Sequence, residues 1–200
     1  MAAEERRNQL LETALETFSH RGFEGTTTKE IAAAAGVTEA VIFRHFPNKH
    51  SLYEAVLAYG HQNSEFQEWI LETQACMDRN DDEGVFRLLA SQILRNYRMD
   101  SRCKRVLLFA ALEGHEQGLE FSRQLSIPVI EMLTQYVTRR QKEGAMQEYP
   151  ATGIIAAVAG MASYFGMMTQ WFGYCSDVPD DEIIETFTRI MMQGIRKNEL

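Results

Sequence analysis

The chain has 200 residues, of which 20 are Lys or Arg and 28 are Asp or Glu, giving a formal net charge of −8. Its composition, 45% hydrophobic with only 4 prolines and 13 glycines, excludes a disordered or collagen-like chain. The acid excess excludes a protein that coats DNA through bulk positive charge, but it permits a compact module that reads DNA through a few placed groups.

The first predicted element is a helix over about residues 4–20. Its apolar stripe is formed by Leu11, Ala14, Leu15 and Phe18. This spacing of three and four residues is typical of one helix face, and Gly22 follows as a C-terminal glycine.

Two short helices follow. Thr27 and Glu30 fit a capping box that opens the second helix, which we expect to end at Gly36. A third helix is predicted over about residues 39–45 and is closed by Pro47.

Asn48 can cap a long fourth helix. Further helices are predicted over about residues 82–98, 102–114, 120–143, 150–173 and 180–197. Pro128 should place a kink or boundary inside the third of these. Because no segment alternates at period two, the sequence predicts an all-α fold of about nine helices.

Residues 26–52 read as a helix, a glycine turn and a second helix. Ala32 and Ala35 are small enough to let a second helix cross closely, and Gly36 can adopt the left-handed conformation of the turn. Such a pattern indicates a helix-turn-helix, whose second helix enters the major groove of DNA. We expect a DNA-binding domain over residues 1–48 and a larger ligand-binding and dimerisation domain over 49–200.

Polar residues in this region point to DNA as well. Thr27, Thr28 and Lys29 lie at a helix N-terminus, where the backbone amides and the helix dipole favour a phosphate. Lys49 begins the fourth helix, where the dipole disfavours a cation unless an anion is close; a merely solvated side chain is the alternative.

From about Arg6 to Leu52 the sequence resembles the DNA-binding domain of the TetR family of bacterial transcription regulators. The resemblance is carried by Phe18, Gly22-Phe23, Thr27-Thr28, Ile31-Ala32, Ala35-Gly36-Val37, His45-Phe46, Asn48-Lys49 and Leu52. Beyond this region, the chain resembles the family in its helical architecture and length.

The resemblance implies which side chains meet DNA. Those implied to contact the backbone are Thr28, Phe43, His45 and Lys49, and those implied to face bases are Lys29, Glu39, Ala40 and Val41. Thr27 and Arg44 complete the predicted DNA-binding set. Ala40 stands where the family usually has Gly, and Phe43 replaces the usual Tyr and so lacks its hydroxyl.

Two of these residues suggest a direct reading of bases. Glu39 could accept a hydrogen bond from a cytosine amino group, and Val41 could touch a thymine methyl group. The alternative for Glu39 is an ordinary first-turn acidic residue, which the helix dipole favours.

The larger domain carries aromatic and polar side chains that suit a small-molecule pocket. The predicted pocket residues are Phe66, Trp69, Phe86, Gln92, Asn96, Phe109, Glu113 and Tyr136. An aromatic lining with few polar groups favours an apolar or amphipathic ligand, and the resemblance implies an inducer. Plain core packing is the alternative for each aromatic residue.

Residues 149–176 carry no charge and are long enough to span a bilayer. Their polar residues and acidic flanks, without a Lys/Arg cluster, argue against spanning, so we expect no membrane partner. Small and bulky apolar residues here favour instead an intermolecular four-helix bundle. The predicted dimer interface comprises Ala156, Gly160, Ser163, Met168, Trp171, Phe187 and Met191.

The cysteines, Cys76, Cys103 and Cys175, are far apart and show no spacing typical of a zinc site or a disulfide framework. We therefore expect no metal and no cofactor. Odd, scattered cysteines and an N-terminus unlike a signal peptide indicate a cytoplasmic protein.

The sequence predicts a homodimeric, ligand-responsive repressor that binds a palindromic DNA operator. Its two recognition helices would enter major grooves about 34 Å apart. The alternatives are a helical small-molecule-binding or adaptor protein without DNA binding, and an all-α enzyme. The enzyme is disfavoured because the sequence has no HExxH, no nucleophile elbow and no glycine-rich phosphate loop.

Overall fold

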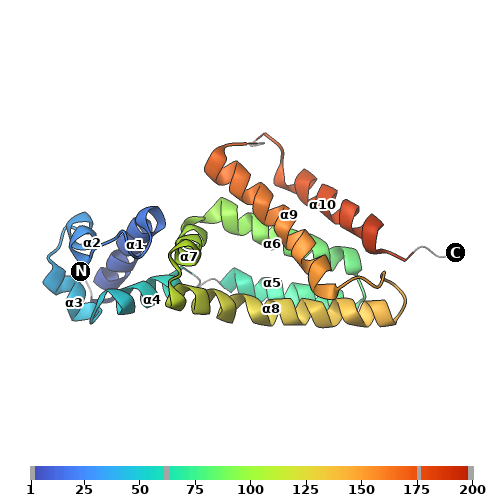
Figure 1. Ribbon diagram of the computed structural model, residues 1–200, viewed down its shortest axis with the longest axis horizontal. Helices are drawn as coiled ribbons and strands as arrows, with labels where there is room; N and C mark the ends of the chain where they lie inside the picture. The colour runs from blue at the N-terminus through green and yellow to red at the C-terminus, as the bar shows by residue number, and fades with distance from the viewer. Residues whose placement is uncertain (1–2, 61–63, 175–176, 198–200) are drawn as a thin grey trace. The chain divides into compact units, whose positions relative to one another are not determined.

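The computed structural model describes residues 3–60, 64–174 and 177–197, and over these ranges its regular elements are ten helices with no strand (Figure 1). In chain order they are α1 (Ala3–Arg21), α2 (Thr28–Ala34), α3 (Glu39–His45), α4 (Lys49–Tyr59), α5 (Ser64–Asp78), α6 (Asp82–Met99), α7 (Arg102–Glu113), α8 (Glu116–Lys142), α9 (Ala151–Phe172) and α10 (Asp180–Ile195). The predicted all-α class is confirmed.

The tenth helix corrects the prediction of one long fourth helix. Helix α4 ends at Tyr59, Gly60 is its C-cap, and α5 begins at Ser64. A Cβ atom added to Gly60 would lie only 1.9 Å from Sγ of Cys103. Glycine therefore allows α7 to pack against the end of α4 at a distance that any side chain would prevent.

The chain divides into two compact units, each with its own hydrophobic core. The first unit comprises residues 1–63 and 102–125, and the second comprises 64–101 and 126–200. Helix α4, helix α7 and the first part of α8 are thus grouped with α1–α3. The domain boundary expected after residue 48 stays a prediction, because compactness alone does not show which part folds independently.

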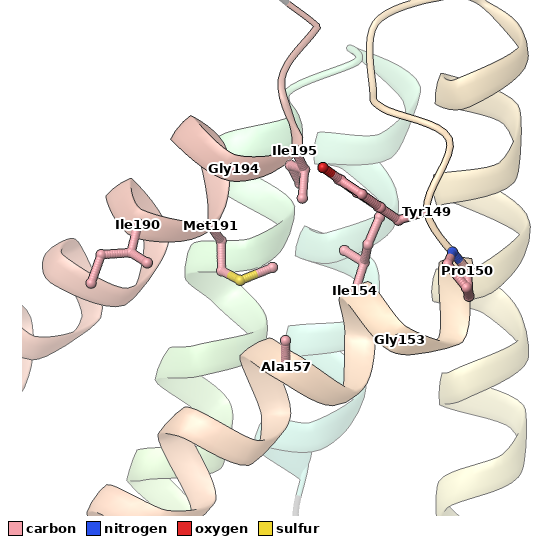
Figure 2. A pocket seen from close by; sticks show the side chains of 9 residues that line it. All are labelled: Tyr149, Pro150, Gly153, Ile154, Ala157, Ile190, Met191, Gly194 and Ile195. Carbon is pink, nitrogen blue, oxygen red and sulfur yellow. The ribbon is translucent and has the colours of Figure 1, made fainter.

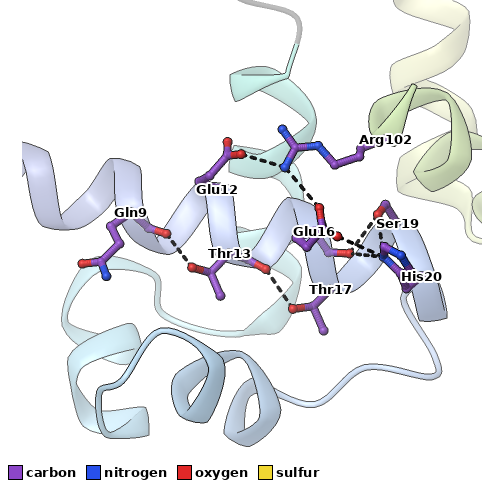
Figure 3. Close-up of polar contacts among 8 residues, drawn as sticks. All are labelled: Gln9, Glu12, Thr13, Glu16, Thr17, Ser19, His20 and Arg102. Carbon is purple, nitrogen blue, oxygen red and sulfur yellow. Dashed lines mark hydrogen bonds and ion pairs between the residues drawn. The ribbon is translucent and has the colours of Figure 1, made fainter. Parts of the chain in front are cut away.

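The core of the first unit forms beneath α1. The predicted stripe of Leu11, Ala14, Leu15 and Phe18 is confirmed, since each of these residues is at most 2% exposed. Ile31 of α2 and Ile42 of α3 are completely buried in the same core. On the outer side of α1, Arg102 Nη1 of α7 lies 2.7 Å from Glu12 Oε1 and 3.2 Å from Glu16 Oε2 (Figure 3).

In the second unit α6 packs against α5, α9 and α10. Two ion pairs join α6 to its neighbours. Arg98 near the end of α6 pairs with Asp180 of α10 at 2.6 Å, and Asp82 at the start of α6 pairs with Arg140 of α8 at 2.8 Å. Helix α8 continues through Pro128 as one element, and the division between the two units falls just before this residue, after 125.

Candidate nucleic-acid interface

The start of α2 is fixed by the predicted capping box, which is confirmed. Thr27 Oγ1 accepts a hydrogen bond from the Glu30 amide at 3.2 Å, and Glu30 Oε2 accepts one from the Thr27 amide at 2.8 Å. These bonds satisfy amides that a helix start would otherwise leave unpaired. The hydrogen bonds that the Glu30 carboxylate accepts from Thr27 favour its charged form and so lower its pKa.

The turn between α2 and α3 depends on Gly36. Its φ of +67° lies in the left-handed region that favours glycine. The Val37 amide then donates to the Ala32 carbonyl at 2.9 Å, which closes the turn. Ile42, buried in the middle of α3, anchors the helix on the core and leaves its opposite face outward. The local geometry is that of a helix-turn-helix.

The predicted DNA-binding residues divide by exposure. Thr27, Lys29, Ala40, Phe43 and Arg44 are exposed, whereas Thr28, Glu39, Val41, His45 and Lys49 are partly buried. Phe43 is 46% exposed, which is unusual for an aromatic side chain on a short helix and is consistent with a contact surface. Val41 packs partly against the core of the first unit, so only part of its side chain is available to a base.

Two residues predicted to act separately are paired. The Thr28 hydroxyl donates a hydrogen bond to Glu39 Oε1 at 2.7 Å. A hydroxyl has a single hydrogen, so while this bond holds Thr28 cannot donate to a phosphate and can only accept. The spacing of the sequence could not show this pair, because α2 and α3 must first cross.

Lys49 is also held rather than free. Its Nζ lies 4.1 Å from the centre of the Phe23 ring, in the geometry of a cation–π contact. Asn48 caps α4 by accepting from the Ser51 amide at 2.9 Å, as predicted. The ammonium group is therefore presented at the N-terminus of α4 by the turn between α1 and α2.

Comparison with known proteins agrees with this geometry. Residues 10–56 match the family model described as bacterial regulatory proteins, tetR family. The HTH-type transcriptional regulator TtgR of Pseudomonas putida is 30% identical over 178 residues, which cover 84% of this chain and 81% of TtgR. The chain belongs to the TetR family. It is therefore a transcriptional regulator, as its resemblance over residues 6–52 implied.

Other known proteins match more locally or in fold alone. RutR of Escherichia coli is 43% identical over 56 residues, 28% of this chain and 26% of RutR. The structure of AibR in complex with isovaleryl coenzyme A and operator DNA has a TM-score of 0.69 at 22% identity, covering 94% of this chain and 99% of AibR. NalD, the secondary repressor of the MexAB-OprM multidrug efflux pump in Pseudomonas aeruginosa, has a TM-score of 0.68 at 19% identity, covering 99% and 100%.

The eight predicted pocket residues of this TetR-family chain divide between the two units. Phe109 and Glu113 lie on α7 in the first unit, whereas Phe66, Trp69, Phe86, Gln92, Asn96 and Tyr136 lie in the second. Phe86 is fully buried, and the Trp69 indole donates to the Leu88 carbonyl at 3.0 Å. In this conformation the buried aromatic residues serve as core.

The remaining pocket residues also have partners. Tyr136 donates to Asp82, and Gln92 donates to Asn96 at 3.2 Å. A surface hollow of about 480 Å³ on α8 is lined by Thr134, Gln135, Thr138, Arg139, Lys142 and Glu143, none of which was predicted. The ligand site of the TetR-family chain stays a prediction.

A second hollow of about 280 Å³ forms an apolar groove between α9 and α10 (Figure 2). It is lined by Tyr149, Pro150, Gly153, Ile154, Ala157, Ile190, Met191, Gly194 and Ile195. Of the predicted dimer residues, Met191 lies in this groove, and Ala156 and Gly160 are exposed on α9. The predicted dimer set did not include Tyr149 and Ile190, and both are more than half exposed.

The other predicted dimer residues are partly covered by their own unit. Trp171 donates to the Ser101 hydroxyl at 3.3 Å, and the Phe187 ring meets Phe165 edge-on at 6.0 Å. Ser163 and Met168 are partly buried. Among the described residues, one helix, α9, is long and apolar enough to cross a membrane.

Proposed function

We propose that this regulator is a ligand-responsive repressor that binds a palindromic operator as a homodimer, in the cytoplasm and without enzymatic activity. The supporting observation is the outward face of α3. Anchored by Ile42 and preceded by a glycine turn, α3 presents Ala40, Phe43 and Arg44 to solvent. A helix held in this way can enter the major groove while α2 crosses the backbone.

Homodimerisation is supported by the apolar groove between α9 and α10. Ile190 is 55% exposed beside Gly194 and Met191, in a chain of which 24% of the residues are charged. Such a surface on a soluble regulator calls for a cover. A second copy supplies one, since a two-fold axis would place each groove against the α9 and α10 helices of the other subunit. We propose that a second subunit, rather than a lipid bilayer, covers the apolar groove.

The inducer is proposed to be a small apolar or amphipathic molecule. The supporting feature is the aromatic core of the second unit, where the Phe66 and Trp69 rings lie 5.5 Å apart and Phe86 belongs to the same core. The solved AibR complex contains isovaleryl coenzyme A, which illustrates that a protein of this fold can bind an acyl ligand. Binding would select a conformation of lower operator affinity, because a ligand shifts an equilibrium only by its differential affinity for the two states.

Selection from a random duplex library by the purified full-length protein tests the proposal. We expect one enriched palindromic motif, saturable binding at low salt and a dimer in sedimentation. Release of the selected duplex is then measured against a panel of short-chain and aromatic acids and their thioesters. A monomer that enriches no sequence would contradict the proposed function.

A further inference from the structure

The turn between α1 and α2 is held by Glu113, the last residue of α7. Glu113 Oε2 accepts hydrogen bonds from the Phe23 amide at 3.1 Å and from the Glu24 amide at 3.4 Å. A Cβ atom on Gly22 would lie 2.0 Å from Glu113 Oε1 and would prevent this approach. The carboxylate thus fixes a backbone segment that has no regular structure of its own.

The same turn carries the aromatic ring beneath Lys49. Phe23 is only 4% exposed, and its ring lies 4.1 Å from Lys49 Nζ and 4.1 Å from the centre of the His115 ring. Because the helix dipole disfavours a cation in the first turn of α4, Lys49 needs a stabilising partner when no phosphate is present. The face of the Phe23 ring supplies one.

These contacts form a continuous chain from Glu113 through Phe23 to Lys49. We propose that Glu113 is a positioning residue for DNA binding, which holds Phe23 so that Lys49 is preorganised to meet a backbone phosphate. The inference rests on the proposed function and on the phosphate contact expected for Lys49. Without Glu113 the two amides lose their acceptor and the turn that carries Phe23 is held less firmly, so Lys49 is no longer aimed at the phosphate and its contribution to the salt slope is lost.

Whether replacing Glu113 weakens or strengthens DNA binding distinguishes a positioning role from simple electrostatic repulsion. Removing a carboxylate near the DNA-binding helices reduces repulsion and should strengthen binding. The proposal predicts the opposite for Glu113→Ala, a loss of about tenfold in affinity for the selected duplex, within the range of ordinary coupling energies. Glu113→Gln keeps an acceptor oxygen and should recover most of the loss. Glu116→Ala is the matched control, because Glu116 is exposed and pairs with Arg123 instead.

A double-mutant cycle provides the deciding measurement. Affinities of wild type, Glu113→Ala, Lys49→Ala and the double variant are measured over a range of salt concentrations. We expect Glu113→Ala and Lys49→Ala each to lower the salt slope by about one phosphate contact, with no further loss in the double variant. A general folding defect would lower the active fraction and leave the slope of the folded molecules unchanged.

The outcomes distinguish this inference from the proposed function. Additive losses, or an affinity for Glu113→Ala that equals or exceeds that of wild type, would overturn the role of Glu113 while leaving the regulator intact. If Glu113→Ala does not fold, the salt slope of Glu113→Gln is measured instead. A positioning role requires this slope to lie closer to that of wild type than to that of Lys49→Ala. If wild type itself enriches no duplex, the proposed function fails and this inference fails with it.

Discussion

The hydroxyl of Thr28 and the carboxylate of Glu39 are joined by a hydrogen bond of 2.7 Å, which links the first residue of α2 to the first residue of α3. The bond uses one carboxylate oxygen of Glu39 and leaves the other able to accept. A residue that is expected to face bases is therefore oriented by a residue that was expected to contact the backbone.

Glu39→Ala should alter which base is preferred at one position of each half-site. Loss of a good contact to a base edge costs about 1–3 kcal/mol of discrimination. Selection from the random library with wild type and variant measures this preference. An unchanged motif would mean that Glu39 is an ordinary first-turn acid.

Thr28→Val should weaken the same preference to a smaller degree, because valine keeps the shape of threonine but cannot hold the Glu39 carboxylate. Thr28→Ser retains a hydroxyl and serves as the control. The two roles predicted for Thr28 give different results in a binding assay. Loss of a phosphate contact lowers affinity for all duplexes alike, whereas loss of orientation lowers it mainly for the preferred one.

Thr27→Ala should lower the free energy of unfolding by about 1 kcal/mol, as expected when a helix loses its N-cap side chain. Urea denaturation followed by far-ultraviolet circular dichroism measures the difference. Thr27→Ser preserves the oxygen that accepts from the Glu30 amide and should remain close to wild type. Equal losses in both variants would show that the methyl group, rather than the cap, stabilises this turn.

The histidine just before α8 should make stability depend on pH. Burial lowers the pKa of His115, and the neighbouring His50 and Lys49 lower it further, while the carboxylates of Glu113 and Glu24 oppose the shift. The unfolded chain then binds a proton more readily than the folded one. Stability is thus present above the usual pKa near 6.5 and is lost as the pH falls toward the folded value.

His115→Gln should reduce this loss. Its free energy of unfolding should fall less than that of wild type between pH about 7.5 and about 5.5, measured by urea titration at each pH. The Gly118 amide donates to His115 Nδ1 at 3.4 Å, an interaction that a protonated ring cannot accept. His20→Gln, at an exposed position on α1, is the control. A variant as sensitive to acid as wild type would assign the pH dependence to other groups.

Ile190→Asp should convert a dimer to a monomer, because a residue on a two-fold interface introduces its charge twice. Light scattering after size-exclusion chromatography measures the mass. Leu71→Asp is a matched control, since Leu71 is 64% exposed on α5, away from the groove. If Leu71→Asp dissociates the protein and Ile190→Asp does not, the dimer interface has been assigned to the wrong surface.

Local physics explains what could be predicted from the sequence. The stripe of α1, the capping box at Thr27 and the left-handed Gly36 each depend on residues within a few positions of one another. The family resemblance rests on the same local features. For this reason the helix-turn-helix and most helix bounds agree with the structure.

Contacts between distant segments were not predictable. Glu113 and Phe23 are 90 positions apart, and nothing in the pattern of α7 indicates that its last carboxylate meets a turn near the N-terminus. Glu113 and Phe109 were predicted as pocket residues, without any sign in the sequence that Glu113 also accepts from the Phe23 amide. Likewise, nothing in the local pattern around Gly60 indicates that Cys103 of α7 packs against it.

The discontinuous first unit has a consequence for synthesis on the ribosome. Its helices α1–α4 are complete long before residues 102–125 are translated, so the early chain lacks Val106 in its core and Glu113 at its turn. A nascent recognition helix would therefore exist before the molecule can hold Lys49 in place. Translation of α7 and the start of α8 completes the DNA-binding head, and a fragment that stops after α4 should be less stable than the same residues in the whole chain.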